Sequence, residues 1–350
     1  MTVTTETYYV LAFVSSLFVS VILMPFIIYI SNKHQLGAQS DSRSSHEGLI
    51  PNLGGIPIAI AIILSSTLYG ELDAVRVMTL CFIFTFVLGV LDDLSEISAY
   101  KKLFTQILIS LVLVIYGGLR IENFYGVLGL YELPYFVSIL FSVFVFVVIT
   151  NGYNLIDGID GLASGLGIIG AISFGFCAIL MNQYNMAILA LSLIGALVGF
   201  LKFNYHPAKI FMGDTGSLLI GLVFSILAVN IIKHGIVEFN NVDGKNSGPF
   251  LAISFLALPL FDSLRVFLVR IRSGDHPLRP GKDHIHHNLL SLGYNHKKTS
   301  FILYIFALII IFFTYILISF NININYSIAL IALISYLLLY VPVYKLRRKK

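Results

Sequence analysis

The chain has 350 residues, of which 57% are hydrophobic and only 11% are charged, and its formal net charge is +4. A soluble domain usually carries about 25% charged residues, so too few polar side chains remain here to coat a globule in water. This composition excludes an ordinary soluble protein and makes the lipid bilayer the main solvent, in which each spanning segment satisfies its own backbone hydrogen bonds.

Eleven apolar stretches follow one another along the chain. They are rich in Leu, Ile, Phe and Ala, and their length favours membrane-spanning helices over barrel strands. We expect spans at roughly 8–31, 54–69, 75–91, 103–118, 133–150, 160–181, 186–203, 215–232, 250–271, 300–320 and 325–344. The expected fold is an all-α integral membrane protein, a polytopic helical bundle that forms a single multispan domain over residues 1–350.

Lysine and arginine are shared unevenly between the two sets of connections. With the N-terminus outside, one set holds most of them: Lys33, Arg43, Lys101, Lys102, Lys202, Lys209, Arg272, Arg279, Lys282, Lys297, Lys298 and the tail from Lys345 to Lys350. The other set holds only Arg76, Arg120, Lys233 and Lys245. The positive-inside rule therefore predicts that the first set is cytoplasmic, including the loop 272–299 and the basic tail 345–350.

The first polar motifs on this predicted cytoplasmic side precede and follow the second and third spans. The loop 41–55 contains Arg43 and His46, which alone would indicate only a charged glycine turn. Asp92 and Asp93 end the third span, where paired anions oppose the helix dipole and repel each other unless a cation or proton intervenes. This cost favours a functional role over a polar stop. Lys102 either neutralises a phosphate or is an ordinary interfacial lysine.

Two further acidic motifs open the sixth and eighth spans. Asn154, Asp157 and Asp160 are spaced by three residues, which a helical turn would bring to one face. A cap needs only one such side chain. In the second motif, Asp214 is either an N-cap or a hard oxygen ligand for Mg²⁺, and Phe211 either packs or stacks on a base.

A basic loop with three histidines follows the ninth span. His284, His286 and His287 lie close to Arg270 in the chain. Three histidines in four residues suggest zinc, but no cysteine and no nearby acid triad completes that site, so contacts to phosphate fit better. Carboxylates, cations and glycine turns at one membrane face predict Mg²⁺-assisted chemistry on a phosphorylated substrate whose partner lies in the bilayer. A secondary transporter for an anion and a membrane scaffold are the alternative classes.

With these motifs, the chain resembles the polyprenyl-phosphate N-acetylhexosamine-1-phosphate transferases, in the branch that acts on undecaprenyl phosphate. The motifs occur in the same order: Arg43-Ser-Ser-His46, Gly54-Gly55, Asp92-Asp93, Asn154-Leu-Ile-Asp157-Gly-Ile-Asp160-Gly, Phe211-Met-Gly-Asp214-Thr-Gly-Ser and His284-Ile-His-His. The resemblance implies a helical bundle with a cytoplasmic active site in a bacterial inner membrane. It also makes a homodimer plausible, and no nucleic acid is expected as a partner.

The resemblance also implies roles for individual residues. Asn154 and Asp214 match the ligands of Mg²⁺, which Mn²⁺ can replace. The implied catalytic residues are Asp92, Asp93, Asp157 and His284. The implied substrate-binding residues are Arg43, His46, Lys102, Asp160, Phe211, Arg270, His286 and His287, with Asp160 and Phe211 in the uridine pocket.

The implied reaction takes N-acetylhexosamine 1-phosphate, with N-acetylglucosamine as the expected sugar, from a UDP-sugar to polyprenyl phosphate and releases UMP. It would start a cell-envelope polysaccharide. The branch that transfers phospho-MurNAc-pentapeptide is the alternative, and it typically carries three consecutive histidines. One departure concerns the residues before His284. The branch usually has Asp-Arg-x there, whereas this chain has Gly281-Lys282-Asp283, which leaves the sugar open.

Overall fold

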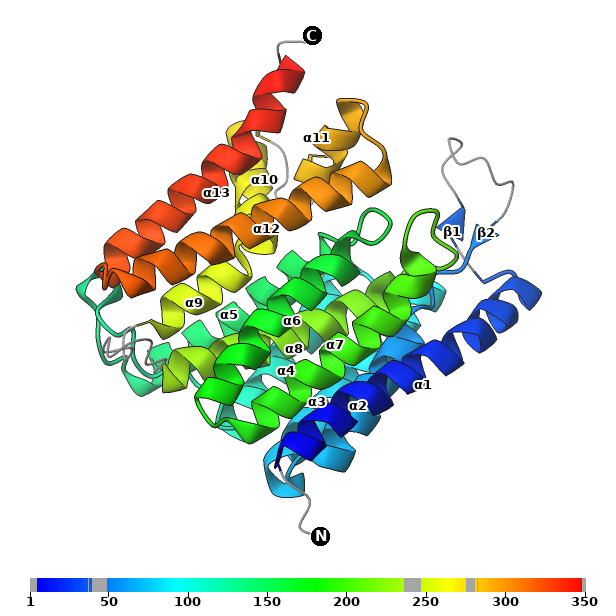
Figure 1. The fold of residues 1–350 in the computed structure, drawn as a ribbon, viewed down its shortest axis with the longest axis horizontal. Helices are drawn as coiled ribbons and strands as arrows, with labels where there is room; N and C mark the ends of the chain where they lie inside the picture. The colour runs from blue at the N-terminus through cyan, green and yellow to red at the C-terminus, as the bar shows by residue number, and fades with distance from the viewer. Residues whose placement is uncertain are drawn as a thin grey trace.

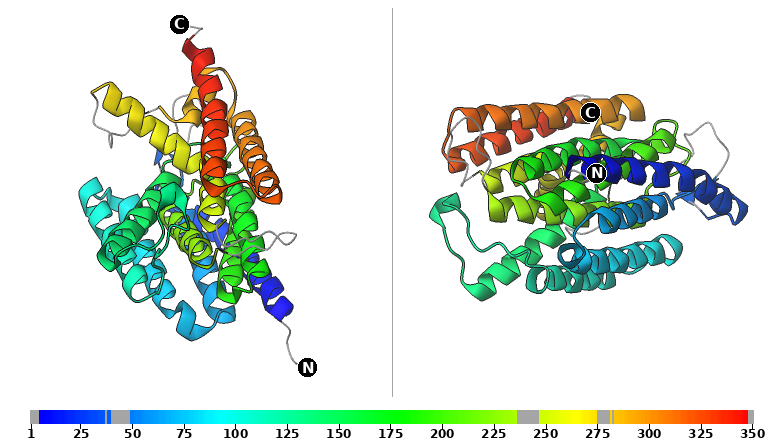
Figure 2. Two further views of the ribbon diagram at one scale, coloured as in Figure 1. Left: turned by 90° about the vertical axis from the view of Figure 1, so that its left-hand side faces the viewer. Right: turned by 60° about the horizontal axis from the view of Figure 1, so that its bottom comes forward.

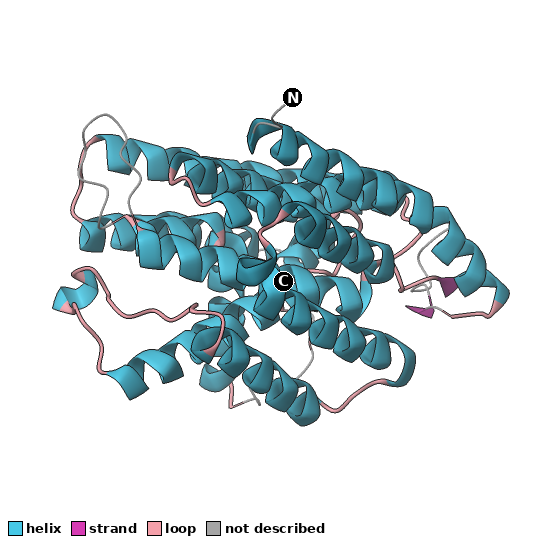
Figure 3. Cartoon of the chain, turned by 90° about the horizontal axis from the view of Figure 1, so that it is seen from below, coloured by secondary structure: helices cyan, strands magenta, loops and turns pink. Residues whose placement is uncertain are grey.

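The computed structural model describes residues 5–36, 38–39, 49–235, 247–274, 281 and 283–347. In these residues the chain is almost entirely helical, and the only strands form a two-stranded antiparallel pair, β1 (Ala38–Gln39) and β2 (Leu49–Ile50). Figure 3 shows helices throughout, with the loops at the two ends of the bundle. The first helices are α1 (Thr5–Lys33), α2 (Gly55–Tyr69), α3 (Leu72–Ser95), α4 (Ala99–Ile115), the 3-10 helix η1 (Val127–Gly129), α5 (Tyr135–Asn154) and α6 (Leu162–Leu180). They are followed by α7 (Tyr184–Asn204), α8 (Gly213–His234), α9 (Gly248–Phe255), α10 (Ala257–Arg272), α11 (Ile285–Ser291), α12 (His296–Ser319) and α13 (Ile324–Arg347).

The helices confirm a polytopic membrane protein. Eight of the described helices are long and apolar enough to cross a membrane, and the count rises to nine if α9 and α10 form one span. These two helices are bent by 75° from each other, and α10 leans out of the bundle in the left view of Figure 2. The predicted spans at 54–69 and 103–118 coincide with the shorter helices α2 and α4, so a total of eleven remains a prediction.

Helix α8 lies at the centre of the bundle. Every residue from Thr215 to Ile231 is buried, and helices α2, α3, α5, α6, α7 and α9 all contact α8. Glycine allows α3 to approach very closely, because a Cβ atom at Gly89 would lie 2.3 Å from the Cα of Thr215. This contact brings the end of α3, where Asp92 and Asp93 lie, against the start of α8.

Helices α1 and α7 run side by side on the outside of this centre, as Figure 1 shows. Serine hydroxyls of α1 join the two helices, since Ser16 and Ser20 donate to the carbonyl oxygens of Ser192 and Ala196. Small residues and hydroxyls at a helix contact are typical of packing inside a membrane. Large apolar side chains on the outer faces of α1, α3 and α12 remain exposed, as lipid contact requires.

The polar motifs gather at one end of the bundle. The loop after β2 reaches the start of α8, because Phe211 N donates to the carbonyl oxygen of Pro51. Helix α11 lies against the turn between α5 and α6, where a Cβ atom at Gly158 would meet the His286 ring. At the opposite end, the segment around η1 contacts α13, since Leu128 N donates to the Asn325 side chain.

Candidate active site

The start of α8 is capped by an acid from another helix. Both carboxylate oxygens of Asp93 accept hydrogen bonds there: Oδ1 from Asp214 N at 2.7 Å, and Oδ2 from Thr215 N at 3.0 Å and Thr215 Oγ1 at 2.5 Å. Asp93 therefore satisfies backbone donors that a local N-cap would otherwise satisfy. Gly213 fits this contact because its φ is +71° and a Cβ atom would lie 2.6 Å from Asp93 Oδ2.

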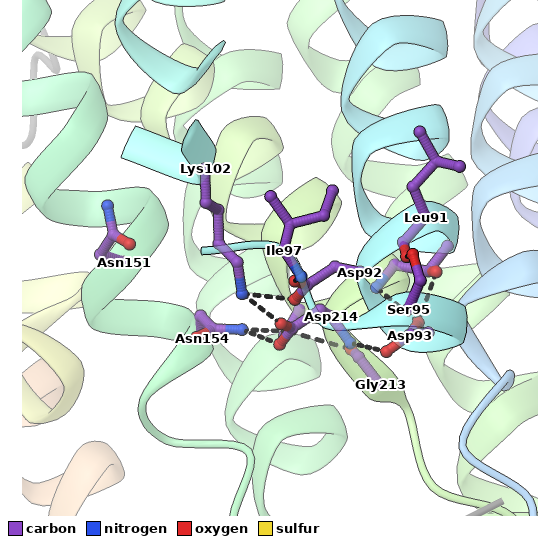
Figure 4. A network of polar contacts seen from close by, with 12 residues as sticks. Leu91, Asp92, Asp93, Ser95, Ile97, Lys102, Asn151, Asn154, Gly213 and Asp214 are labelled. Atoms are coloured by element: carbon purple, nitrogen blue, oxygen red, sulfur yellow. Dashed lines mark hydrogen bonds and ion pairs between the residues drawn. The ribbon is translucent and has the colours of Figure 1, made fainter. Parts of the chain in front are cut away.

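With the cap supplied by Asp93, the side chain of Asp214 faces other polar groups. Lys102 Nζ lies 2.5 Å from its Oδ2, and Asn154 Nδ2 donates to its Oδ1 at 2.6 Å. In Figure 4 the dashed contacts of Lys102 and Asn154 meet at Asp214. Asp214 therefore does not act as the N-cap of α8, because the carboxylate of Asp93 accepts from the backbone N–H groups at the start of this helix.

Asp92 completes this cluster from the end of α3. Its Oδ1 accepts from Ile97 N at 2.7 Å, and its Oδ2 forms an ion pair with Lys102 Nζ. The Asp92 side chain is only 7% exposed, so this charge is nearly removed from solvent. The ammonium group of Lys102 thus bridges the carboxylates of Asp92 and Asp214, which are far apart in the sequence.

The cluster fits a hard cation. Two carboxylates and the amide of Asn154 offer the oxygen donors that Mg²⁺ prefers. The ammonium group of Lys102 already lies between Asp92 and Asp214, which shows that this position attracts positive charge. The residues present therefore suit the Mg²⁺ expected from the sequence, with Asp214 and Asn154 as the residues that would hold it.

Asp157 lies in the turn between α5 and α6, close enough for electrostatic interaction with the carboxylates of the cluster. Burial, with a smaller contribution from the carboxylates of Asp214, Asp93 and Asp160, raises the pKa of Asp157 to about 7. Among the described residues, none donates a hydrogen bond to its carboxylate. Near neutral pH this side chain therefore exchanges a proton readily, as a general acid or base must.

The raised pKa predicts a pH-dependent effect of Asp157→Asn in the metal-free protein. Between about pH 4 and about pH 7 the folded protein holds a proton that the unfolded chain releases, so stability falls as pH rises through this window. The asparagine variant lacks this loss. We expect its melting temperature in detergent to exceed that of the wild type at pH 8 and to match it below pH 4. Parallel pH profiles for the two proteins would contradict the assignment.

The histidine motif is organised by a buried acid of α10. Asp262 Oδ2 lies 2.9 Å from His284 Nδ1, and Asp262 Oδ1 accepts from Arg265 at 2.7 Å. The carboxylate also accepts from Ile285 N at the start of α11. Asp262 thereby fixes the orientation of the His284 ring and leaves its Nε2 for other contacts.

The other predicted phosphate-binding residues lie around this histidine. Arg270, which is 8% exposed, pairs with Asp283 at 3.2 Å, and the rings of His286 and His287 lie 4.2 Å apart. Burial lowers the pKa of His286 to about 3, with the charge of His287 adding to this effect, so His286 is neutral at physiological pH. A neutral ring suits hydrogen bonding better than charge pairing with phosphate.

The predicted site residues fall into two groups and a remainder. One cluster, joined by ion pairs and hydrogen bonds, contains Asp92, Asp93, Lys102, Asn154 and Asp214. The histidine motif packs against the turn that contains Asp157. Phe211 lies in the loop before α8, held to the residues after β2. Arg43, His46 and Lys282 lie outside the described residues, as does part of the loop 272–299.

Several residues of the site were not selected from the sequence. Asp262 is an ionisable residue inside an apolar stretch, a signal that by itself indicates function in a membrane protein. His206 and His296, which contact Asp160, gave no comparable signal. Thr215 and Ser217 looked like ordinary helix-start residues, although Asn154 also donates to Ser217 Oγ at 2.8 Å.

Comparison with known proteins identifies the family of the chain. The family model described as glycosyl transferase family 4 matches residues 75–232, which include both aspartate motifs and the start of α8. A probable undecaprenyl-phosphate N-acetylglucosaminyl 1-phosphate transferase of Bacillus subtilis (strain 168) is 34% identical over 306 residues, covering 86% of this chain and 82% of the relative.

More distant relatives have similar names. A decaprenyl-phosphate N-acetylglucosaminephosphotransferase of Mycolicibacterium smegmatis is 31% identical over 296 residues, covering 77% of this chain and 72% of the relative. An undecaprenyl-phosphate alpha-N-acetylglucosaminyl 1-phosphate transferase of Escherichia coli (strain K12) is 28% identical over 283 residues, covering 77% of this chain and 73% of the relative.

Proposed function

The chain belongs to glycosyl transferase family 4, in the branch of the undecaprenyl-phosphate N-acetylglucosamine-1-phosphate transferases, and from this premise we propose its reaction. It transfers N-acetylglucosamine 1-phosphate from UDP-N-acetylglucosamine to undecaprenyl phosphate and releases UMP, as the first step of a cell-envelope polysaccharide. The observation that carries the proposal is the cluster of Asp92, Lys102, Asn154 and Asp214 at one end of a membrane bundle.

Phosphoryl transfer mainly requires that the two substrates are positioned next to each other and that the negative charge on their phosphates is neutralised. Mg²⁺, held by Asp214 and Asn154, would offset negative charge on the donor diphosphate. The acceptor is a phosphate monoester with a second pKa near about 6, so it is largely a dianion at neutral pH and needs no strong base. Lys102 is suited to draw this phosphate toward the donor, and Asp157 is suited to take the last proton when the monoanion binds.

The histidine motif is suited to hold the donor. His284, fixed by Asp262, presents Nε2 as a hydrogen-bonding group, and Arg270 adds a fixed positive charge nearby. The sequence His284-Ile-His-His favours an N-acetylhexosamine over MurNAc-pentapeptide as the transferred group. The lipid acceptor would reach the same end of the bundle from within the membrane.

The direct test uses purified protein with undecaprenyl phosphate, Mg²⁺ and either UDP-N-acetylglucosamine or UDP-MurNAc-pentapeptide. We expect UMP release and a diphosphate-linked glycolipid only with the first donor. Turnover only with the second donor would assign the chain to the peptidoglycan branch. No UMP from either donor, with bound anion translocated across vesicles instead, would make it a transporter.

We further propose that the site faces the cytoplasm of a bacterial inner membrane, where UDP-sugars are made, and that the N-terminus is outside. In protein without Cys81 and Cys177, a cysteine at the exposed Ser291 of α11 should resist a membrane-impermeant thiol reagent in intact cells. A cysteine at the exposed Glu132, near the opposite end of the bundle, should be labelled. The reverse labelling pattern would refute the orientation and the donor assignment together.

A further inference from the structure

Three segments far apart in the sequence bring two imidazoles to one carboxylate. Asp160 lies in the turn before α6, His206 in the loop after α7, and His296 is the first residue of α12. His206 Nδ1 lies 2.6 Å from Asp160 Oδ2, and His296 Nδ1 lies 3.2 Å from Asp160 Oδ1. The three potential ligand atoms all lie within 4.8 Å of one another.

The carboxylate is held firmly, while the imidazoles remain accessible. Asp160 is 8% exposed at its side chain, and its Oδ2 also accepts from Ala208 N at 3.2 Å. Ser300 of α12 donates to the backbone oxygen of Asp160. The side chains of His206 and His296 are 39% and 38% exposed, so a ligand can enter from solvent and an open coordination position can hold water.

Within the described part of the chain, the Nδ1 atom of His296 forms an ion pair with Asp160 but lacks good hydrogen-bond geometry. This atom is buried and has no partner with hydrogen-bond geometry, although Asp160 Oδ1 lies 3.2 Å away. Buried polar atoms are normally paired, so such an atom calls for an explanation. A metal ion between the nitrogen and the carboxylate would supply one.

We propose that Asp160, His206 and His296 form a binding site for a transition metal ion of the Zn²⁺ class. Two imidazole nitrogens and one carboxylate are a common ligand set for zinc, with bonds of about 2.0–2.2 Å. The donors differ from the oxygen-only set at Asp214 and Asn154, which suits Mg²⁺. The two sites therefore select different ions. A bound ion would tie α12 to the turn that carries Asp157 and to the loop before α8.

The histidines of α11 do not offer an equivalent set among the described residues. Asp262 contacts His284 but is already paired with Arg265, whose positive charge opposes a metal ion. The sequence pattern of three histidines favours α11, whereas the described residues place two imidazoles, and no arginine or lysine, in ion-pair contact with Asp160.

The test compares zinc binding by chelator-treated wild type and by the double variant His206→Gln/His296→Gln, in detergent and without substrates. Glutamine keeps a hydrogen-bond donor for Asp160 but is a poor zinc ligand. The matched control is His234→Gln at the far end of α8. We expect one tightly bound zinc ion per chain in wild type and control, and affinity weakened by more than ~100-fold in the double variant, since even outer partners of a metal typically contribute ~10–100-fold. Zinc should raise the melting temperature of the wild type and the control only.

X-ray absorption of zinc-loaded wild type keeps the proposal testable if the double variant fails to fold. The proposal requires two imidazole ligands, and their signal must persist in a variant with His284, His286 and His287 all replaced by glutamine. Equal zinc affinity in wild type and double variant, no tight zinc in wild type, or loss of the signal with the α11 histidines would each overturn it. None of these measurements uses turnover or a nucleotide, so their outcome does not depend on the role in the uridine pocket that the family resemblance implies for Asp160.

Discussion

Asp214→Asn is expected to lower turnover by about 10³-fold and to weaken the dependence of the residual rate on Mg²⁺. Removing a single group that stabilises transition-state charge commonly costs about 10²–10³-fold, and here a hard anionic ligand is lost as well. Asparagine keeps the volume and can still contact Asn154 and Lys102, so the fold should survive. UMP release measured across a Mg²⁺ titration reports both effects.

The control for this substitution is Asp73→Asn. Asp73 lies in the first turn of α3, its side chain is 95% exposed, and it pairs only with Arg76 among the described residues. It therefore changes the net charge by the same amount, far from the cluster, and should leave turnover unchanged. Near-normal activity of Asp214→Asn at low Mg²⁺ would show that Asp214 is not a metal ligand.

The helical membrane fold could be predicted because its cause is compositional. A stretch such as 215–232 has no other stable conformation in lipid than a helix, so its existence and length follow from hydropathy. The bend between α9 and α10 could not be predicted in this way. Hydropathy alone treats 250–271 as one continuous span. The break at Leu256 instead precedes Pro259 in the first turn of α10, and Pro259 has no N–H to donate to the carbonyl oxygen of Phe255.

Site residues could be predicted from the sequence where their position is energetically unfavourable without a function. They could not be predicted where their role depends on packing between distant helices. Asp92-Asp93 was conspicuous because paired acids at a helix end are unfavourable. The two acids make different contacts because Gly89 packs against Thr215. This packing places Asp93 at the start of α8, where it accepts hydrogen bonds, and places Asp92 beside Lys102, with which it forms an ion pair. No sequence spacing encodes that contact.

The same reasoning applies to the acids beyond the first cluster. Asp160 was assigned to the uridine pocket through the family resemblance, but its imidazole neighbours come from the loop after α7 and from the start of α12, 46 and 136 residues away. Asp262 lies 22 residues from His284. Only the packing of the folded chain brings these pairs together, so the sequence did not show that His284 meets Asp262 or that His206 and His296 meet Asp160.

The last prediction concerns how the new bond forms. The lipid phosphate can attack the donor's β-phosphorus directly, or an aspartate can attack first and form a phosphosugar-enzyme intermediate. We expect direct attack, because the acceptor is already an anionic oxygen nucleophile and one site can hold both substrates. The hydrogen bonds agree with this choice: both oxygens of Asp93 accept from α8, and those of Asp92 contact Ile97 and Lys102.

Isotope exchange separates the two routes. Enzyme freed of lipid is incubated with UDP-N-acetylglucosamine, Mg²⁺ and radiolabelled UMP. Direct attack predicts no label in the sugar nucleotide, because UMP cannot return without the lipid product, and adding undecaprenyl phosphate should restore exchange. Lipid-free exchange would instead require a covalent intermediate, and its loss in Asp92→Asn, Asp93→Asn or Asp157→Asn would identify the nucleophile. Asp157 is the strongest rival candidate, since none of the described residues donates a hydrogen bond to its carboxylate.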